Sequence, residues 1–173
     1  MVSFRLTTEV RAPPEFVVHW WLDYSSGDTG LTSGMVHRSV QRIDENRVHL
    51  TTATEFGGRV RTTDGTVTRT GPRTWHMTGH VISDGVVVST LQTSYAVEPL
   101  ANGSRLQADY EFQGRTFPWR LALALSGYSL RRRQRRSFRD FVRAIETEFD
   151  ASRSGPPPGT SKPAPPPGSV PPA

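Results

Sequence analysis

RLQADYEFQ, the stretch at residues 105–113, and the long segment after it carry the clearest structural signal in the chain. In residues 105–113 every second side chain is apolar, which is the pattern of a β-strand with one buried and one solvated face. From Phe117 to Phe149 the apolar spacing changes to that of a helix. The predicted inward stripe of this helix is Leu121, Leu125, Tyr128, Phe138, Val142, Ile145 and Phe149. A strand of this kind followed by a long amphipathic helix predicts an α+β domain.

Regular turn signals divide the preceding segment into short β-rich runs. Gly and Asp-Gly or Asn-Gly pairs favour tight connections between antiparallel strands. Six strands therefore follow one another between Val36 and Gln113. The five predicted turns are 44–46, 57–58, 71–72, 84–85 and 101–103.

The N-terminus adds one more strand and a short helix. Residues 4–11 alternate between apolar and polar, which predicts a half-buried strand. Pro13, Pro14 and Glu15 then suit the first turn of a helix, which we place at about residues 13–22. The expected order is strand, short helix, six strands, long helix.

Composition limits the classes of protein to which this chain can belong. The 173 residues predict one domain at 1–150, followed by a disordered Pro-rich tail at 151–173. The chain has no cysteine, which excludes disulfides, thiolate zinc sites and a cysteine nucleophile. The net charge of +5 is too small to favour nucleic acid as a partner. The start of the chain does not read as a signal peptide, so we expect a cytoplasmic protein.

Three local motifs occur in the order that one known superfamily shows. They are VRAPPEFV at residues 10–17, RTGPRTW at 69–75 and NGSRL at 102–106. With the amphipathic C-terminal helix, the chain resembles the START-like superfamily, also called SRPBCC, over about residues 3–150. The resemblance implies a helix-grip fold, in which a curved seven-stranded antiparallel sheet wraps around the long C-terminal helix and leaves a cavity between them. Members of this superfamily bind lipids, hormones or polyketides, and some catalyse cyclisation or dehydration.

Turn geometry predicts which side chains face that cavity. If Glu98 pairs with Arg105, the inward side chains on the last two strands include Leu91, Thr93, Tyr95, Tyr110 and Phe112. If Ser83 pairs with Val86, the strand before them points His76 and His80 inward. A single bulge would instead point Trp75, Met77 and Val81 inward, which their hydrophobicity favours. We adopt the histidine register as the expectation.

These side chains define the candidate site. We expect Leu91, Thr93, Tyr95, Tyr110 and Phe112 to contact a ligand, with Tyr128 and Arg135 reaching it from the helix. The candidate catalytic residues are His76, His80 and Tyr110. His76 and His80 would lie about 13 Å apart along a strand, too far to share a metal ion. We therefore expect no metal. No Gly-rich phosphate-binding loop is present, so we expect no cofactor either.

The expected function is binding or transport of a small hydrophobic ligand, such as a lipid or a polyketide-like molecule. One alternative is an enzyme of the polyketide cyclase/aromatase or dehydratase type that uses cavity histidines and tyrosines. A second alternative is peripheral contact with a membrane through the Arg-rich helix, where the apolar segments 117–119 and 121–125 precede the basic run 131–136.

Overall fold

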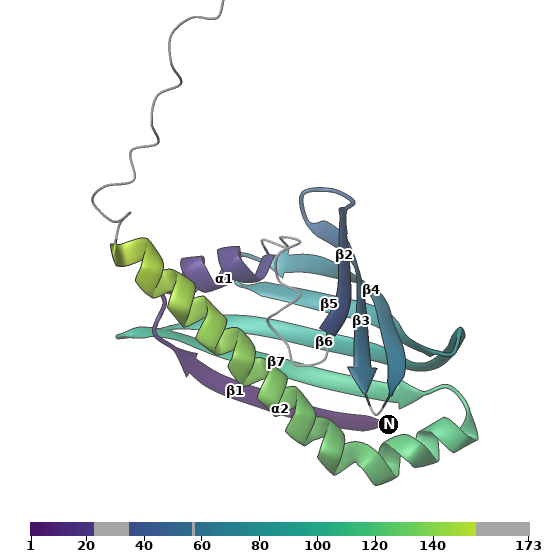
Figure 1. Cartoon of the computed structure of the whole chain (residues 1–173). Helices are drawn as coiled ribbons and strands as arrows, with labels where there is room; N and C mark the ends of the chain where they lie inside the picture. The colour runs from purple at the N-terminus through teal and green to yellow at the C-terminus, as the bar shows by residue number, and fades with distance from the viewer. Residues whose placement is uncertain (23–34, 57, 155–173) are drawn as a thin grey trace, which may run out of the picture.

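Seven strands form one antiparallel sheet in the computed structural model, which describes residues 1–22, 35–56 and 58–154 (Figure 1). The strand order is β1-β7-β6-β5-β4-β3-β2, so the first strand pairs with the last. The elements are β1 (Val2–Val10), α1 (Pro14–Leu22), β2 (Met35–Arg42), β3 (Arg47–Phe56), β4 (Arg59–Gly71), β5 (Thr74–Ser83), β6 (Val86–Leu100), β7 (Gly103–Gly114) and α2 (Phe117–Ser154).

This architecture confirms the predicted α+β helix-grip fold with seven antiparallel strands and a long C-terminal helix. The strand boundaries fall at all five predicted turns, and α1 matches the helix expected at about residues 13–22. α2 continues to Ser154, four residues beyond the predicted end of the domain. The rest of the predicted tail lies outside the described residues.

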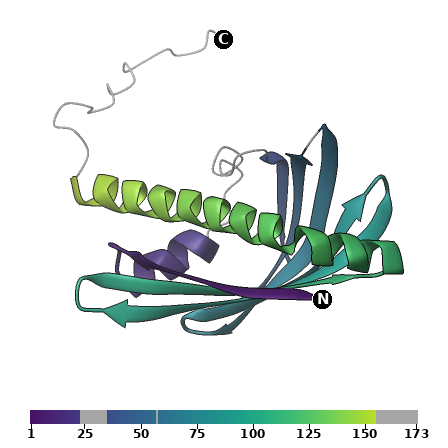
Figure 2. The same cartoon turned by 90° about the horizontal axis from the view of Figure 1, so that it is seen from below.

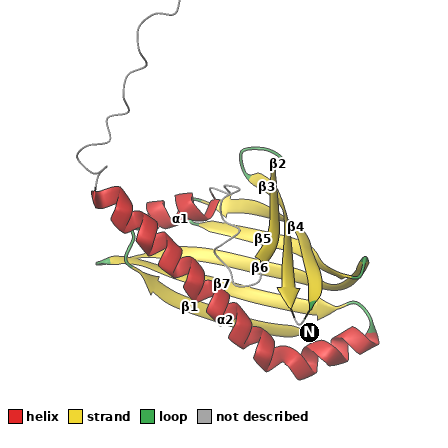
Figure 3. Cartoon of the chain, in the orientation of Figure 1, coloured by secondary structure: helices red, strands yellow, loops and turns green. Residues whose placement is uncertain are grey.

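Both helices cover the same face of the sheet, and the sheet curves around them (Figures 1, 2 and 3). The core fills the space between the two layers. Its sheet side includes Leu6, Trp75, Met77, Val97, Leu106 and Phe112, and its helix side includes Val17, Phe138, Val142 and Ile145. Within the described ranges, no helix combines the length and the apolar character that crossing a bilayer requires.

Two facing glycines mark the place where the sheet bends. Gly65 on β4 is paired with Gly79 on β5. A Cβ atom added at Gly65 would lie 2.6 Å from the carbonyl oxygen of Thr78, and one at Gly79 would lie 2.6 Å from that of Asp64. Only glycine tolerates such a close approach of two backbones. Beyond this pair, β2, β3 and β4 rise toward the side of the sheet that carries α2 (Figure 2).

The register of β5 differs from the expectation, and His76 and His80 lie on the outer face of the sheet. Ser83 does pair with Val86, as predicted. Ile82 then pairs with Val87 but Val81 pairs with Ser89, so Val88 is an extra residue on β6. This bulge reverses the two faces of β5 relative to β6. Trp75 and Met77 are therefore buried, and the histidine register is wrong.

The inward stripe of α2 was also predicted incorrectly in its first half. Tyr128 is 81% exposed, and Leu121 and Leu125 are exposed as well. The ten residues from Tyr128 to Phe138 turn an α-helix by about 1,000°, roughly 80° short of three full turns, so these two side chains lie on different faces. The inward side chains of the first half are the partly buried Trp119, Leu123 and Leu130.

The bulge predicts very different losses of stability for two substitutions on the same strand. Trp75→Ala should lower the free energy of unfolding by about 3–5 kcal/mol, because it removes a fully buried aromatic ring. His80→Ala should change it by less than about 0.5 kcal/mol, because His80 is exposed. Urea denaturation followed by circular dichroism measures both. A larger loss for His80→Ala than for Trp75→Ala would contradict this register.

Candidate functional site

Four side chains with polar atoms form a continuous patch on the inner face of β5, β6 and β7. Trp75 pairs with Tyr95 across β5 and β6, and Thr93 pairs with Tyr110 across β6 and β7. The ring centroids of Trp75 and Tyr95 are 5.3 Å apart, and their planes differ by 13°. Tyr110 meets Tyr95 edge to face at 6.2 Å. We call these four residues the inner patch.

Aromatic side chains from both helices cover the inner patch. The Trp21 ring of α1 lies 5.0 Å from the Tyr95 ring and 5.8 Å from the Trp75 ring. Trp21 in turn contacts Phe141 of α2 at 5.1 Å and Phe138 at 6.3 Å. The surroundings of the patch are therefore apolar and largely shielded from water, which strengthens any hydrogen bond formed there.

Two polar atoms of the inner patch are buried without a hydrogen-bond partner among the described residues. They are the indole nitrogen Nε1 of Trp75, whose N–H can only donate, and the hydroxyl oxygen Oγ1 of Thr93. Burial raises the pKa of the nearby Tyr95 phenol and the Thr93 hydroxyl opposes this rise, but the two groups are not in hydrogen-bond geometry. An unsatisfied buried polar group costs about 1–3 kcal/mol, so its presence needs an explanation.

The two phenols of the patch stay neutral over the physiological pH range. Burial raises the pKa of Tyr110 to about 12, and the Tyr95 hydroxyl beside it acts in the opposite direction. Burial also raises the pKa of Tyr95 well above its ordinary value, and the neighbouring Tyr110 adds to this effect. Neutral phenols can donate a hydrogen bond to a ligand oxygen.

A second polar region lies at the end of the inner face where α2 begins. Arg61 on β4 has its Nε atom buried, and its guanidinium carbon is 5.8 Å from the centre of the Trp119 ring. Half-buried Arg133 of α2 is close enough that burial first, and then the charge of Arg61, lowers its pKa. Two like charges in a partly dry space favour an electron-rich partner.

The predicted ligand contacts are divided between the inside and the outside of the molecule. Leu91, Thr93, Tyr95, Tyr110 and Phe112 all lie on the inner face, because Glu98 pairs with Arg105 as predicted. Tyr128 and Arg135 are exposed on the far side of α2, so they do not line the interior. This is a correction, and its cause is the mistaken helix stripe.

Sequence reasoning did not assign a site role to Trp21, Trp75 or Arg61. Trp75 was present in the alternative register, where its hydrophobicity was the correct signal. The position of Arg61 on the inner face follows from the same register. One face of β4 carries Val67, Gly65, Thr63 and Arg61. No local pattern distinguishes it from the exposed arginines.

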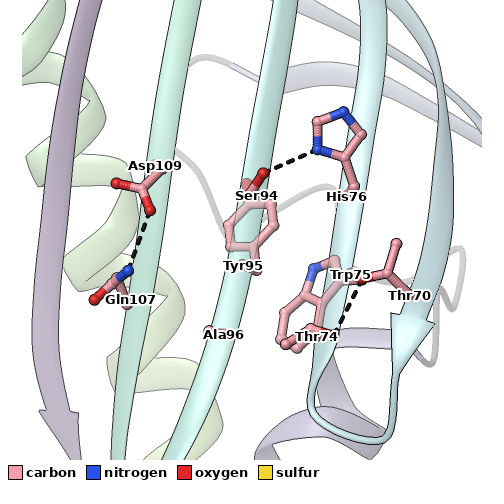
Figure 4. Close-up of a pocket in the computed structure, with 9 residues that line it drawn as sticks. All are labelled: Thr70, Thr74, Trp75, His76, Ser94, Tyr95, Ala96, Gln107 and Asp109. Carbon is pink, nitrogen blue, oxygen red and sulfur yellow. Dashed lines mark hydrogen bonds between the residues drawn. The ribbon is translucent and has the colours of Figure 1, made fainter.

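His76 lines a hollow on the outer face of the sheet and does not reach the interior. Figure 4 shows the residues that line this hollow of about 350 Å³. His76 Nδ1 lies 2.9 Å from Ser94 Oγ, and Gln107 Nε2 donates to Asp109 at 3.1 Å. These side chains are already paired with one another and open to water, which is typical of a solvated sheet face. No cluster of three metal-ligating side chains occurs in the ranges that the structure describes.

Several solved structures share this fold. The Zhui aromatase/cyclase from Streptomyces sp. R1128 is 13% identical with a TM-score of 0.67, over 87% of this chain and 94% of that protein. A START superfamily protein from Mycobacterium smegmatis is 14% identical with a TM-score of 0.62, over 88% and 99%. A conserved protein from Geobacillus kaustophilus is 15% identical with a TM-score of 0.67, over 87% and 97%. At these identities the likeness concerns the fold alone.

Sequence comparison gives the family directly. No curated protein matches the chain. The family model described as polyketide cyclase / dehydrase and lipid transport matches residues 1–147, which include every strand, α1 and most of α2. The chain therefore belongs to the polyketide cyclase / dehydrase and lipid transport family.

Proposed function

We propose that this protein binds a small, largely apolar molecule between the inner face of the sheet and α2. An oxygen atom of that molecule accepts hydrogen bonds from Trp75 Nε1 and Thr93 Oγ1. The observation that carries this proposal is that both atoms are buried without a partner among the described residues. A bound carbonyl or ether oxygen would satisfy the indole N–H and the threonine hydroxyl together, and would remove the cost of burying them.

The side chains around the inner patch indicate which other chemical groups the ligand carries. Trp21, Phe138 and Phe112 present apolar surface around it. The neutral phenols of Tyr95 and Tyr110 can add weaker polar contacts without introducing a charge. A ligand long enough to reach Arg61 and Trp119 would place an electron-rich or acidic group there. The expected class is therefore an apolar or aromatic molecule with one or two oxygen functions.

The same geometry favours binding or carriage over acid–base catalysis. A general acid or base works best with a pKa near the operating pH. The histidines that could provide such a group at positions 76 and 80 lie on the outer face, and the pKa values of Tyr95 and Tyr110 are raised away from neutrality. The cyclase or dehydratase alternative would have to use these phenols or the arginines.

Thr93→Val provides a sharp test because it should separate stability from affinity. The substitution keeps the shape of the side chain but removes a hydroxyl that makes no hydrogen bond, so the unfolding free energy should stay the same or rise by about 1 kcal/mol. The probe is Prodan, a neutral naphthalene ketone whose fluorescence shifts when its carbonyl leaves water. Its affinity should fall about tenfold in the variant, which corresponds to one lost hydrogen bond.

Thr78→Val is the matched control, because Thr78 lies on the outer face of neighbouring β5 and is exposed. It should leave Prodan binding unchanged. Failure of the wild-type protein to bind Prodan or related aromatic ketones would overturn the proposal. Equal affinity of wild type and Thr93→Val would show that the hydroxyl does not contact the ligand.

The raised pKa of Tyr110 predicts a loss of stability in alkaline solution. The folded state keeps this phenol protonated to about pH 12, whereas the unfolded chain releases its proton near pH 10. The resulting stabilisation is complete below pH 10 and is lost as the pH rises toward 12. In Tyr110→Phe the fall in unfolding free energy above pH 10 should be smaller by about 2 kcal/mol. Urea titrations at a series of pH values measure it.

Tyr128→Phe is the control for this experiment, since the Tyr128 ring is exposed in the folded protein and in the unfolded chain alike. It should keep the alkaline profile of the wild type. If Tyr110→Phe also keeps that profile, the Tyr110 phenol is not buried in solution.

A further inference from the structure

Exposed large apolar side chains gather at one end of the molecule. In the described ranges all of them except Ile43 lie at the end where the β3–β4 and β5–β6 hairpins meet the start of α2. The pairing of strands fixes this placement, because Met35 is opposite Thr54, Arg61 is opposite Ser83 and Ser89 is opposite Gly114. The residues are Met1, Val36, Val60, Val86, Phe117, Leu121, Leu125 and Tyr128.

The first half of α2 is apolar on both of its sides. Trp119, Leu123 and Leu130 face the sheet and are partly buried. The opposite side carries Phe117, Leu121, Leu125 and Tyr128, which are 77%, 51%, 80% and 81% exposed. Arg120 is the single charged residue between positions 117 and 130. A helix that is apolar all round is normally covered on every side, by protein or by lipid. We call the four exposed residues the outer stripe.

A dense positive charge follows the outer stripe along the same helix. Arg131, Arg132, Arg135 and Arg136 are exposed, and Arg139 is exposed one turn later. At about 100° per residue, positions 132, 135 and 139 continue the face of the outer stripe. The chain carries no acidic residue between positions 117 and 139. The surface that covers the outer stripe therefore has to be apolar next to a layer of negative charge.

We propose that this end of the protein docks on the surface of an anionic lipid bilayer. The outer stripe enters the boundary between headgroups and acyl chains, and the arginines contact lipid phosphates. Arg132 lies about 10 Å along the helix axis from Leu125, so the positive charge follows directly on the apolar segment. This docking surface lies outside the inner patch, so it does not depend on the ligand-binding proposal.

Charge argues against a second copy of the chain as the occupant. The outer stripe of another copy brings the same arginines and no acid within positions 117–139. An anionic bilayer supplies both the apolar layer and the negative charge. Each arginine near such a surface adds attraction that falls within a Debye length, so salt should weaken the contact.

The test is flotation of the full chain with lipid vesicles. The protein should float with vesicles that contain about one quarter phosphatidylglycerol in phosphatidylcholine. It should stay in solution with pure phosphatidylcholine, and about 0.5 M salt should release it. Leu121→Glu should weaken binding on the order of tenfold or more, because a leucine no longer enters the bilayer and a negative charge faces anionic lipid. Arg132→Gln should weaken it about fivefold without touching the apolar contact.

Two control substitutions exist at the opposite end of the sheet. Ile43→Glu changes an apolar residue that is 50% exposed, against 51% for Leu121, and Arg42→Gln removes an exposed arginine. Both should leave flotation unchanged. The proposal would be overturned if the wild-type protein did not bind anionic vesicles at low salt. It would also be overturned if the Leu121→Glu variant floated with vesicles as the wild type does. A dimer in sedimentation velocity that Leu121→Glu dissociates, without any vesicle binding, would show that the outer stripe pairs copies of the chain.

Discussion

The burial of Trp75 is the constraint on which the rest of the structure depends. Its side chain is 1% exposed, stacks on Tyr95 and contacts Trp21 of α1. Because neighbours on a strand alternate between faces, an inward Trp75 forces His76 and His80 outward. The same ring brings α1 against the sheet and, through Trp21, holds Phe138 and Phe141 of α2 above the inner patch. One buried indole thus positions both helices and selects the polar atoms that face the interior.

The sequence predicted those parts of the fold whose register follows from local turn chemistry. Glu98 pairs with Arg105 because the connection between them has a length that the turn residues specify. The faces of β5 could not be obtained in this way, since the extra residue Val88 is one valine in a run of three and carries no distinguishing pattern. Hydrophobicity alone would have corrected the error, because burying Trp75 and Met77 is worth more than burying His76 and His80.

The first half of α2 shows a different reason for failure. A helix with apolar residues on both sides offers two possible stripes, and periodicity cannot decide which of them faces the sheet. The wrong choice pointed Arg135 toward the ligand, although it lies outside the core. The sequence did show that an apolar segment of α2 is followed by a basic one. Both segments contribute to the outer surface of the helix and not to the core.

The inner patch and the outer stripe are connected by α2 itself. Phe117 and Trp119 are two residues apart and point to opposite sides of the helix, one toward solvent and one toward Arg61. Under the two proposals, the arginine-lined end of the interior adjoins the end that meets lipid.

The pairing of β1 with β7 has a consequence for how the chain reaches this structure. Residues 2–10 can join the sheet only after residues 104–112 have been synthesised, because each lies opposite the other. The five hairpins between β2 and β7 close short loops and can form early, whereas the β1–β7 pair has to close a loop of about one hundred residues, which is entropically costly and slow. Until then, β7 remains an open edge, and a nascent chain would present it to any other extended segment nearby. A chaperone that shields Gly103–Gly114 until β1 pairs with it would therefore protect the folding chain from pairing with other chains.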